Sequence, residues 1–253
     1  MTNYYCLVTG LPELSLEDGK LSYTVANFKT EIYPELSKSD KKLVDLFYLK
    51  FDNRNLLTLL KDKEESVDTS LGNYSADELL SVIASFKEET APDKKFPAYF
   101  YEFAELYLNT PDEERWGLED KLHGFYYNHA MKSGNPFVSA WFELNLDVNN
   151  ILAAMTARKY KMEVAKVPVG ENLVAEALRS SNARDFGLAD DLEYFEQLVR
   201  INDTIDLVER EKKIDLLKWN WMEDNTFFNY FTIEKIFVFL MKLEMIERGV
   251  SLD

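Results

Sequence analysis

Two stretches of this sequence share one phrase: Phe47–Leu57 reads FYLKFDNRNLL and Phe142–Leu152 reads FELNLDVNNIL. Both follow the pattern F-x-L-x-[FL]-D-x-x-N-[LI]-L, and they begin 95 positions apart, at 47 and 142. A basic residue follows each phrase at the same distance, Lys63 after the first and Arg158 after the second, and on a helix each is expected to lie on the same face as the aspartate and the asparagine of its copy. This spacing is longer than a solenoid repeat and is typical of a small domain. The phrase therefore predicts a duplicated unit.

The aspartate and the asparagine of each copy are expected to lie on one face of a helix. Asp52 and Asn55 are three positions apart, as are Asp147 and Asn150, and a step of three returns close to the same face. Asp and Asn are poor residues for a helix interior because their side chains compete for backbone hydrogen bonds. Their matched positions predict that they bind backbone groups of an adjoining helix end or loop and organise a bundle.

The composition favours an all-α fold. Of the 253 residues 46% are hydrophobic and 14% aromatic, which supports a well-filled core. The low counts of 9 Gly and 7 Pro suit helices better than turn-rich sheets. The short apolar run at 4–8 fits either a strand or a buried helical turn. Hydrophobic periodicity predicts helices at roughly 22–33, 39–62, 75–88, 96–109, 111–132, 136–160, 171–181, 189–199, 203–222 and 226–249.

Local signals mark two of the helix starts. Ser75 and Glu78 have the spacing of a capping box, in which each side chain satisfies a free backbone N–H. Thr110 is expected to cap the 111–132 helix with Pro111 in its first turn. The 136–160 helix carries one continuous apolar seam, which we interpret as ordinary core.

Charge and cysteine content restrict the possible partners. The formal net charge of −16 argues against nucleic-acid binding and against direct adsorption to an anionic membrane. The most apolar late segment, Ile236–Met245, contains charged residues and is too short to span a bilayer. Cys6 has no partner for an internal disulfide and is expected to be buried. The N-terminus lacks the features of a secretory signal, so we expect a cytoplasmic protein.

Reactive residues form no recognisable catalytic pattern, so we expect a protein that is not an enzyme and needs no cofactor. His123 and His129 are six positions apart and face different directions on one helix. Asp120 and His123 have the spacing of half a helical di-iron site, with Glu102 on the preceding helix, but a second such motif is missing. A helical metal-dependent enzyme therefore stays the least favoured alternative.

An aromatic stretch near the C-terminus has two interpretations. Its residues favour burial in the core, whereas an exposed arrangement would make an interaction patch on a helical adaptor. The residues are Trp219, Trp221, Phe227, Phe228, Tyr230 and Phe231.

The duplicated phrase resembles the C-type stalk component of bacterial and archaeal V-type ATP synthases, whose eukaryotic counterpart is the d-type component. In detail the chain looks closest to a bacterial family associated with V-type ATP synthase operons. Gly170 lies in a short break as expected for the C-type component, and the ending 227–248 is similar to the closing helix of that component. The residues that carry the family motif are Phe47, Asp52, Asn55, Leu56, Phe142, Asp147, Asn150 and Arg158.

The resemblance implies an all-α fold of repeated helical bundle units. We expect a first unit at 1–95, a second at 96–185 and C-terminal helices at 186–253 that form a degenerate third unit. That third unit lacks the Asp and the Asn. The resemblance further implies a non-catalytic central-stalk (rotor) subunit, cytoplasmic and peripheral to the inner face of the cell membrane. Its partners would be the proteolipid ring and the central-stalk subunits; the alternative in another class is a helical adaptor or assembly protein.

Overall fold

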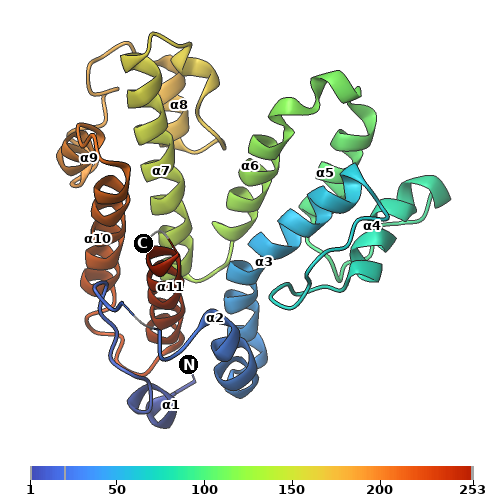
Figure 1. The fold of residues 1–253 in the computed structure, drawn as a ribbon, viewed down its shortest axis with the longest axis horizontal. Helices are drawn as coiled ribbons and strands as arrows, with labels where there is room; N and C mark the ends of the chain where they lie inside the picture. Colours follow the sequence, from blue (N-terminus) through green and yellow to red (C-terminus); the bar gives the residue numbers. More distant parts are fainter. Residues whose placement is uncertain (1, 20, 252–253) are drawn as a thin grey trace.

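The computed structural model describes residues 2–19 and 21–251, and within that part of the chain every regular element is a helix (Figure 1). The all-α prediction is therefore confirmed. The α-helices are α1 (Tyr5–Thr9), α2 (Val25–Asn27), α3 (Lys38–Lys61), α4 (Ala76–Glu88), α5 (Ala98–Asn109), α6 (Leu118–Ala130), α7 (Pro136–Lys159), α8 (Leu173–Ser180), α9 (Phe195–Asn202), α10 (Leu207–Asn225) and α11 (Ile233–Val250). Short π or 3-10 turns are η1 (Phe28–Ile32), η2 (Tyr33–Glu35), η3 (Asp112–Gly117) and η4 (Val164–Lys166).

The long periodic segments form helices close to their predicted bounds, and the short ones depart from them. The 22–33 segment becomes α2 followed by η1 and η2, and Pro34 lies within that last turn. Helix α9 begins at Phe195 instead of 189, because residues 189–194 form turns. Helix α11 begins at Ile233 instead of 226, because α10 continues to Asn225 and the chain then turns. The ambiguous run at 4–8 is helical and overlaps α1.

One of the two predicted helix starts is confirmed and the other is wrong. Ser75 and Glu78 form the capping box of α4, with both reciprocal hydrogen bonds present. Thr110 instead ends α5, and its hydroxyl donates back to the carbonyl oxygen of Leu106. The segment after Thr110 starts as the 3-10 turn η3, and α6 follows only from Leu118.

The helices gather into two groups that lie side by side and meet in the lower half of the view in Figure 1. Helices α3, α4, α5 and α6 pack on one another, and α7 packs with α8, α9 and α10. Helix α11 contacts α2, α3, α7 and α10, so it bridges the two groups. The predicted unit boundaries at 95 and 185 fall in the connections before α5 and before α9. The division into units itself stays a prediction.

A single apolar core runs through both groups. It extends from Tyr4 to Met245 and includes the predicted seam of α7, where Trp141 and Val148 are buried. Burial of apolar surface is the main force that holds such a helical body together. Among the described helices, none is both long and apolar enough to cross a lipid bilayer.

Candidate functional site

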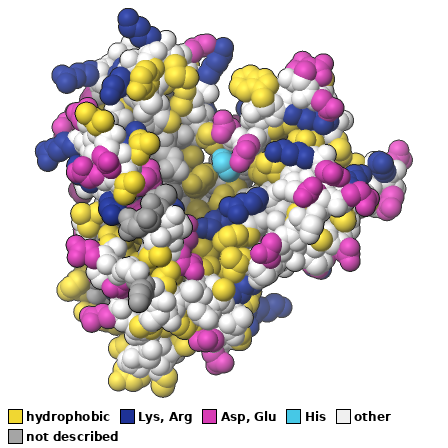
Figure 2. Space-filling model, in the orientation of Figure 1, with side chains coloured by type: hydrophobic (Ala, Val, Ile, Leu, Met, Phe, Trp, Pro, Cys, Tyr) yellow, Lys and Arg dark blue, Asp and Glu magenta, His cyan; other side chains and the backbone are white. Residues whose placement is uncertain are grey.

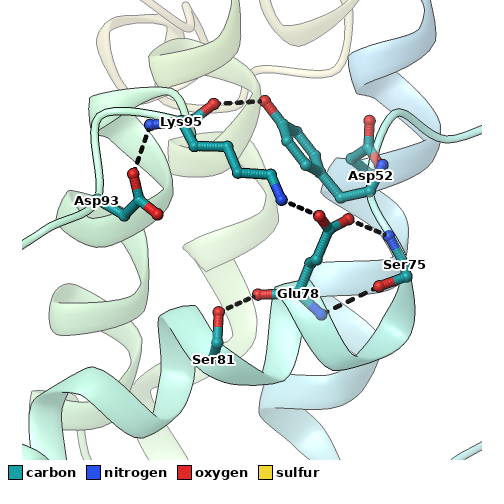
Figure 3. A network of polar contacts seen from close by, with 7 residues as sticks. Asp52, Ser75, Glu78, Ser81, Asp93 and Lys95 are labelled. Atoms are coloured by element: carbon teal, nitrogen blue, oxygen red, sulfur yellow. Dashed lines mark hydrogen bonds and ion pairs between the residues drawn. The ribbon is translucent and has the colours of Figure 1, made fainter.

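The first copy of the phrase lies in α3, and its aspartate anchors the connection that leads into α4. Asp52 is completely buried, and its carboxylate accepts hydrogen bonds from the backbone N–H groups of Asn73 and Tyr74 at 2.9–3.1 Å. Figure 3 shows Asp52 beside the start of α4, next to the capping box of Ser75 and Glu78. The side chain thus fixes the residues that immediately precede a helix.

The first anchor is possible because the backbone at Gly72 passes close to the carboxylate of Asp52. A Cβ atom at Gly72 would lie 2.5 Å from Oδ1 of Asp52, closer than real Cβ atoms come. Lys29 adds a positive charge here, and its Nζ donates to the carbonyl oxygen of Gly72. The anchor therefore needs a glycine at position 72 as well as the aspartate.

The asparagine of the first copy binds the same connection further upstream. Nδ2 of Asn55 donates to the carbonyl oxygen of Asp68 at 2.8 Å. Phe47 and Leu56 of the phrase are buried in the core. Asn53 also links α3 to α5, because its Oδ1 accepts a hydrogen bond from the hydroxyl of the buried Tyr99.

The second copy lies in α7 and anchors the connection into α8. Oδ1 of Asp147 accepts a hydrogen bond of 2.7 Å from Nδ2 of Asn172, the residue whose own Oδ1 caps α8. Asn150 exchanges two hydrogen bonds of 2.8 and 2.9 Å with the backbone of Val169. Phe142 is buried on the same helix. In both copies the aspartate thus holds the start of the next helix, and the asparagine holds the loop before it.

The basic residues that follow the two phrases occupy different surroundings. Arg158 donates to the carbonyl oxygens of Ala183 and Arg184 and stacks on Phe186, with its guanidinium carbon 3.8 Å from the ring centroid. Lys63 is exposed and lies beyond the end of α3 at Lys61, so it shares no helix face with Asp52. The predicted equivalence of the two basic residues is therefore wrong.

Burial makes both anchoring carboxyls harder to ionise. It raises the pKa of Asp52 from the ordinary 3.8 to about 6, against the lowering effect of the donated backbone hydrogen bonds and of Lys29. It raises the pKa of Asp147 to about 7, against the hydrogen bond from Asn172 and with the help of the nearby Glu143 charge. Raised pKa values can mark catalytic acids, but both carboxyls here bind the ends of loops. The geometry identifies them as structural anchors.

One protein-family model, described as "Protein of unknown function (DUF2764)", matches residues 1–253. The chain belongs to this family. No curated protein and no solved structure matches it. The match to the DUF2764 family spans all of the described residues, and the family's description assigns no activity to the residues that form the anchors.

The DUF2764 chain also contains a partly buried ionic cluster that the sequence pattern did not reveal. Nζ of Lys50 lies 2.9 Å from Oε1 of Glu244, which joins α3 to α11. Arg248 pairs with the buried Asp215, which joins α11 to α10. Lys218 is buried nearby, and burial lowers its pKa to about 8. One signal in the sequence could have indicated this cluster. Positions 215, 218 and 222 have the spacing of one helix face, and this face of α10 is buried and carries two charged residues, Asp215 and Lys218.

The aromatic stretch near the C-terminus is only partly buried, so the core interpretation is wrong for its second half. Trp219 and Trp221 pack against the core, but Phe227, Phe228 and Tyr230 are 64%, 84% and 57% exposed. The reason is the turn between α10 and α11, which replaces the predicted helical start. Together with Tyr5 and Phe231, whose rings lie 4.7 Å apart, these three exposed residues form what we call the aromatic patch. Figure 2 shows hydrophobic side chains at the corresponding lower end of the molecule.

Most of the other candidate reactive residues are exposed side chains. Cys6 is exposed, which contradicts the predicted buried thiol, because α1 lies on the surface. His123 is exposed, and His129 is half-buried with its ring 5.3 Å from that of Tyr99. In the described ranges 2–19 and 21–251, no three residues of the types His, Cys, Asp and Glu gather as metal ligands. Glu102 and Asp120 are exposed side chains.

Proposed function

We propose that this DUF2764 protein is a non-catalytic central-stalk subunit of a V-type ATP synthase or ATPase, which couples the membrane rotor ring to the central stalk. The observation that carries the proposal is the pair of equivalent anchors. Asp52 with Asn55, and Asp147 with Asn150, tie a long helix to the loop and helix that follow it. The phrase that resembles the C-type stalk component is thus also the phrase that organises both units.

The anchors suit a part that transmits force. A torque-carrying body must resist deformation, and close-packed helices with fixed connections have low compressibility. The connections into α4 and α8 are fixed by hydrogen bonds between buried side chains and loop residues. The proposed role needs no chemistry, only stiffness and two contact surfaces.

Two surface features offer such contacts. Figure 2 shows the surface hollowed between α6 and α7, with hydrophobic side chains on its floor, where the foot of a central stalk could dock. The aromatic patch lies at the lower end, where α1 meets the turn before α11 (Figure 1). Contiguous exposed aromatic side chains are a common mark of a protein interface. We propose that the protein docks with the patch on the cytoplasmic face of the ring.

Co-purification from the native organism tests the proposal. An affinity-tagged chain, expressed from its own locus, should bring down proteolipid-ring and central-stalk subunits from detergent-solubilised membranes in constant ratio. Recovery of incomplete complexes alone would instead indicate an assembly protein. Recovery of unrelated proteins, without rotary ATPase subunits, would indicate an adaptor and would refute the rotor assignment.

A matched pair of variants separates the patch from general surface hydrophobicity. The double substitution Phe227→Ser and Phe228→Ser should abolish ring recovery while the fold is retained, as checked by circular dichroism. The control, Ile205→Ser with Leu207→Ser, changes side chains that are 94% and 72% exposed elsewhere on the molecule. The control should recover the ring as the wild type does. Equal recovery with both variants would exclude the aromatic patch as the ring contact.

A further inference from the structure

The molecule contains a basic cleft that neither the anchors nor the proposed rotor contacts use. It has a volume of about 1120 Å³ and lies between the first half of α3, the connection from α4 to α5 and the end of α6. We call it the lysine cleft. Its basic residues are Lys38, Lys42, Lys94, Lys95, Lys132 and the half-buried His129.

The positive charge of the lysine cleft is largely uncompensated. Among the described residues, Lys38, Lys42, Lys94 and Lys132 have no carboxylate within ion-pair distance. The acidic residue in the lining is Asp45, and its Oδ1 accepts a hydrogen bond from the Tyr33 hydroxyl. In a chain with a net charge of −16, a surface that gathers five lysines and a histidine around one carboxylate is a local departure from the average charge.

The wall that carries Lys94 is held in place by the first anchor. Asp52 fixes the backbone at Tyr74, and the Tyr74 hydroxyl donates to the carbonyl oxygen of Lys95 at 3.1 Å. The backbone N–H of Lys95 donates to Asp93, and its ammonium pairs with Glu78 (Figure 3). The connection is therefore fixed before any partner arrives, which reduces the entropy lost on binding.

The lining is amphipathic, and this restricts the chemistry of an occupant. Its accessible apolar lining comes from Leu43, Pro97 and Ala98, with the nearly buried Leu46, Leu49 and Phe96 beneath them. A small inorganic anion would use the lysines but would leave this apolar surface without a partner. An occupant that satisfies both features carries acidic and apolar groups together.

The charge of the surrounding surface limits the length of the occupant. On the face shown in Figure 2, acidic side chains are spread among basic ones, and the whole chain is strongly acidic. A long polyanion such as a nucleic acid would leave the cleft and meet repulsive surface. In addition, the described lining offers lysines without arginine, and lysine acts as a point charge without the paired donors that match a phosphate group.

We infer that the lysine cleft binds a short acidic peptide segment of a partner protein, with glutamate or aspartate on the lysines and apolar side chains on Leu43, Pro97 and Ala98. This inference is independent of the rotor assignment. The lysines would steer the segment into place, and the apolar floor would add affinity once it is bound.

A labelled peptide measures this binding directly. The probe is a short fluorescein-labelled peptide in which glutamate and leucine alternate, followed by fluorescence anisotropy against the full chain at low salt. We expect saturable binding that weakens as salt is added. Matched peptides with glutamine for glutamate, or serine for leucine, should bind at least about tenfold more weakly, because each lacks half of the complementary chemistry.

Protein variants of equal charge locate the site. Lys42→Glu with Lys132→Glu reverses two exposed cleft lysines and should weaken binding at least about tenfold. The control, Lys63→Glu with Lys121→Glu, makes the same change of net charge at exposed positions outside the cleft and should stay within about twofold of the wild type. Thermal melts of both variants check that the fold is retained.

Three results would overturn the inference. The first is no saturable binding of the glutamate–leucine peptide, and the second is an equal loss of affinity in the cleft variant and its control. The third is tripolyphosphate or a single-stranded oligonucleotide binding in a cleft-dependent way while the peptide does not, which would identify a phosphate ligand. Because the assay contains no ATPase component, its outcome does not depend on whether the rotor proposal holds.

Discussion

Asp147→Asn should stabilise the protein at alkaline pH, and the effect should disappear in mild acid. Burial raises the pKa of Asp147 from the ordinary 3.8 to about 7, so the folded protein holds this proton more tightly than the unfolded chain does. A raised carboxyl pKa lowers stability as the pH rises from about 4 to about 7, and the loss remains constant above that. An amide of the same shape removes the ionisation.

The size of the effect follows from the same values. The rise in the pKa of Asp147 from 3.8 to about 7 corresponds to about 4 kcal/mol of lost stability at pH 8, at about 1.4 kcal/mol for each tenfold change in proton affinity. The asparagine oxygen can still accept the hydrogen bond from Asn172, but its N–H groups need partners of their own, which offsets about 1–2 kcal/mol. We therefore expect a net gain of about 2 kcal/mol at pH 8.

Urea unfolding of the wild type and the variant at several pH values, followed by tryptophan fluorescence, measures this difference. Glu105→Gln is the control, because it makes the same carboxylate-to-amide change at an exposed position of α5 that does not act on Asp147. The control should change the free energy of unfolding by less than about 0.5 kcal/mol. An Asp147→Asn variant that is less stable at pH 8, or whose stability difference is the same at pH 5 and pH 8, would refute the reasoning.

The other anchor residues give three further predictions, each measurable by thermal or urea unfolding. Asp52→Ala should cost about 3 kcal/mol at pH 7, because it leaves the partly buried N–H groups of Asn73 and Tyr74 without their acceptor; a cost below about 1 kcal/mol would contradict this role. Gly72→Ala should cost about 1–3 kcal/mol, since its Cβ would meet Asp52, and unchanged stability would show that the carboxylate moves aside freely. Arg158→Gln should cost about 1–2 kcal/mol through lost hydrogen bonds to two loop carbonyl groups, whereas Lys63→Gln should be neutral.

The sequence predicts the anchors because they combine two independent signals. Asp52 and Asp147 are poor helix residues within otherwise regular helices, and the same phrase surrounds each of them. A residue that is unfavourable within its own helix needs a hydrogen-bond partner elsewhere. Because the phrase occurs twice, the same kind of partner is expected for both copies. The prediction that these side chains bind backbone groups of an adjoining loop or helix end agrees with Asp52, which accepts from the N–H of Asn73, whereas Asp147 accepts from the side chain of Asn172.

The exposed aromatic patch could not be predicted because helix periodicity does not locate a helix end. Phe227 and Phe228 fit a helical pattern as well as Phe237 does, yet α10 ends at Asn225 and leaves them in a turn. Thr226 is buried there, and its hydroxyl donates to the carbonyl oxygen of Met222. Such side-chain hydrogen bonds at a helix end depend on tertiary packing, which a sequence window does not contain.

The lysine cleft could not be predicted from the sequence, for a different reason. Its lysines come from three separate parts of the chain, at 38–42, 94–95 and 132, and each part taken alone is a solvated surface segment. Only the fold brings them together, and only the structure shows which lysines lack a carboxylate partner. Net charge gives the opposite impression, because a total of −16 says nothing about a local basic surface.

A coupling role requires the two helical groups to move as one body, and the anchors alone do not achieve this because each acts within its own group. The junction supplies the remaining stiffness. Helix α11 packs on both α3 and α7, and the Lys50–Glu244 pair crosses from the first group to α11. The pairing of Arg248 with Asp215 continues from α11 to α10. Asp215 is buried, whereas Lys50, Glu244 and Arg248 are partly exposed, so relative motion of the groups would leave the Asp215 carboxylate without its partner and would break one partly screened pair. The ionic cluster therefore resists relative motion of the two helical groups, and the anchors resist deformation within each group.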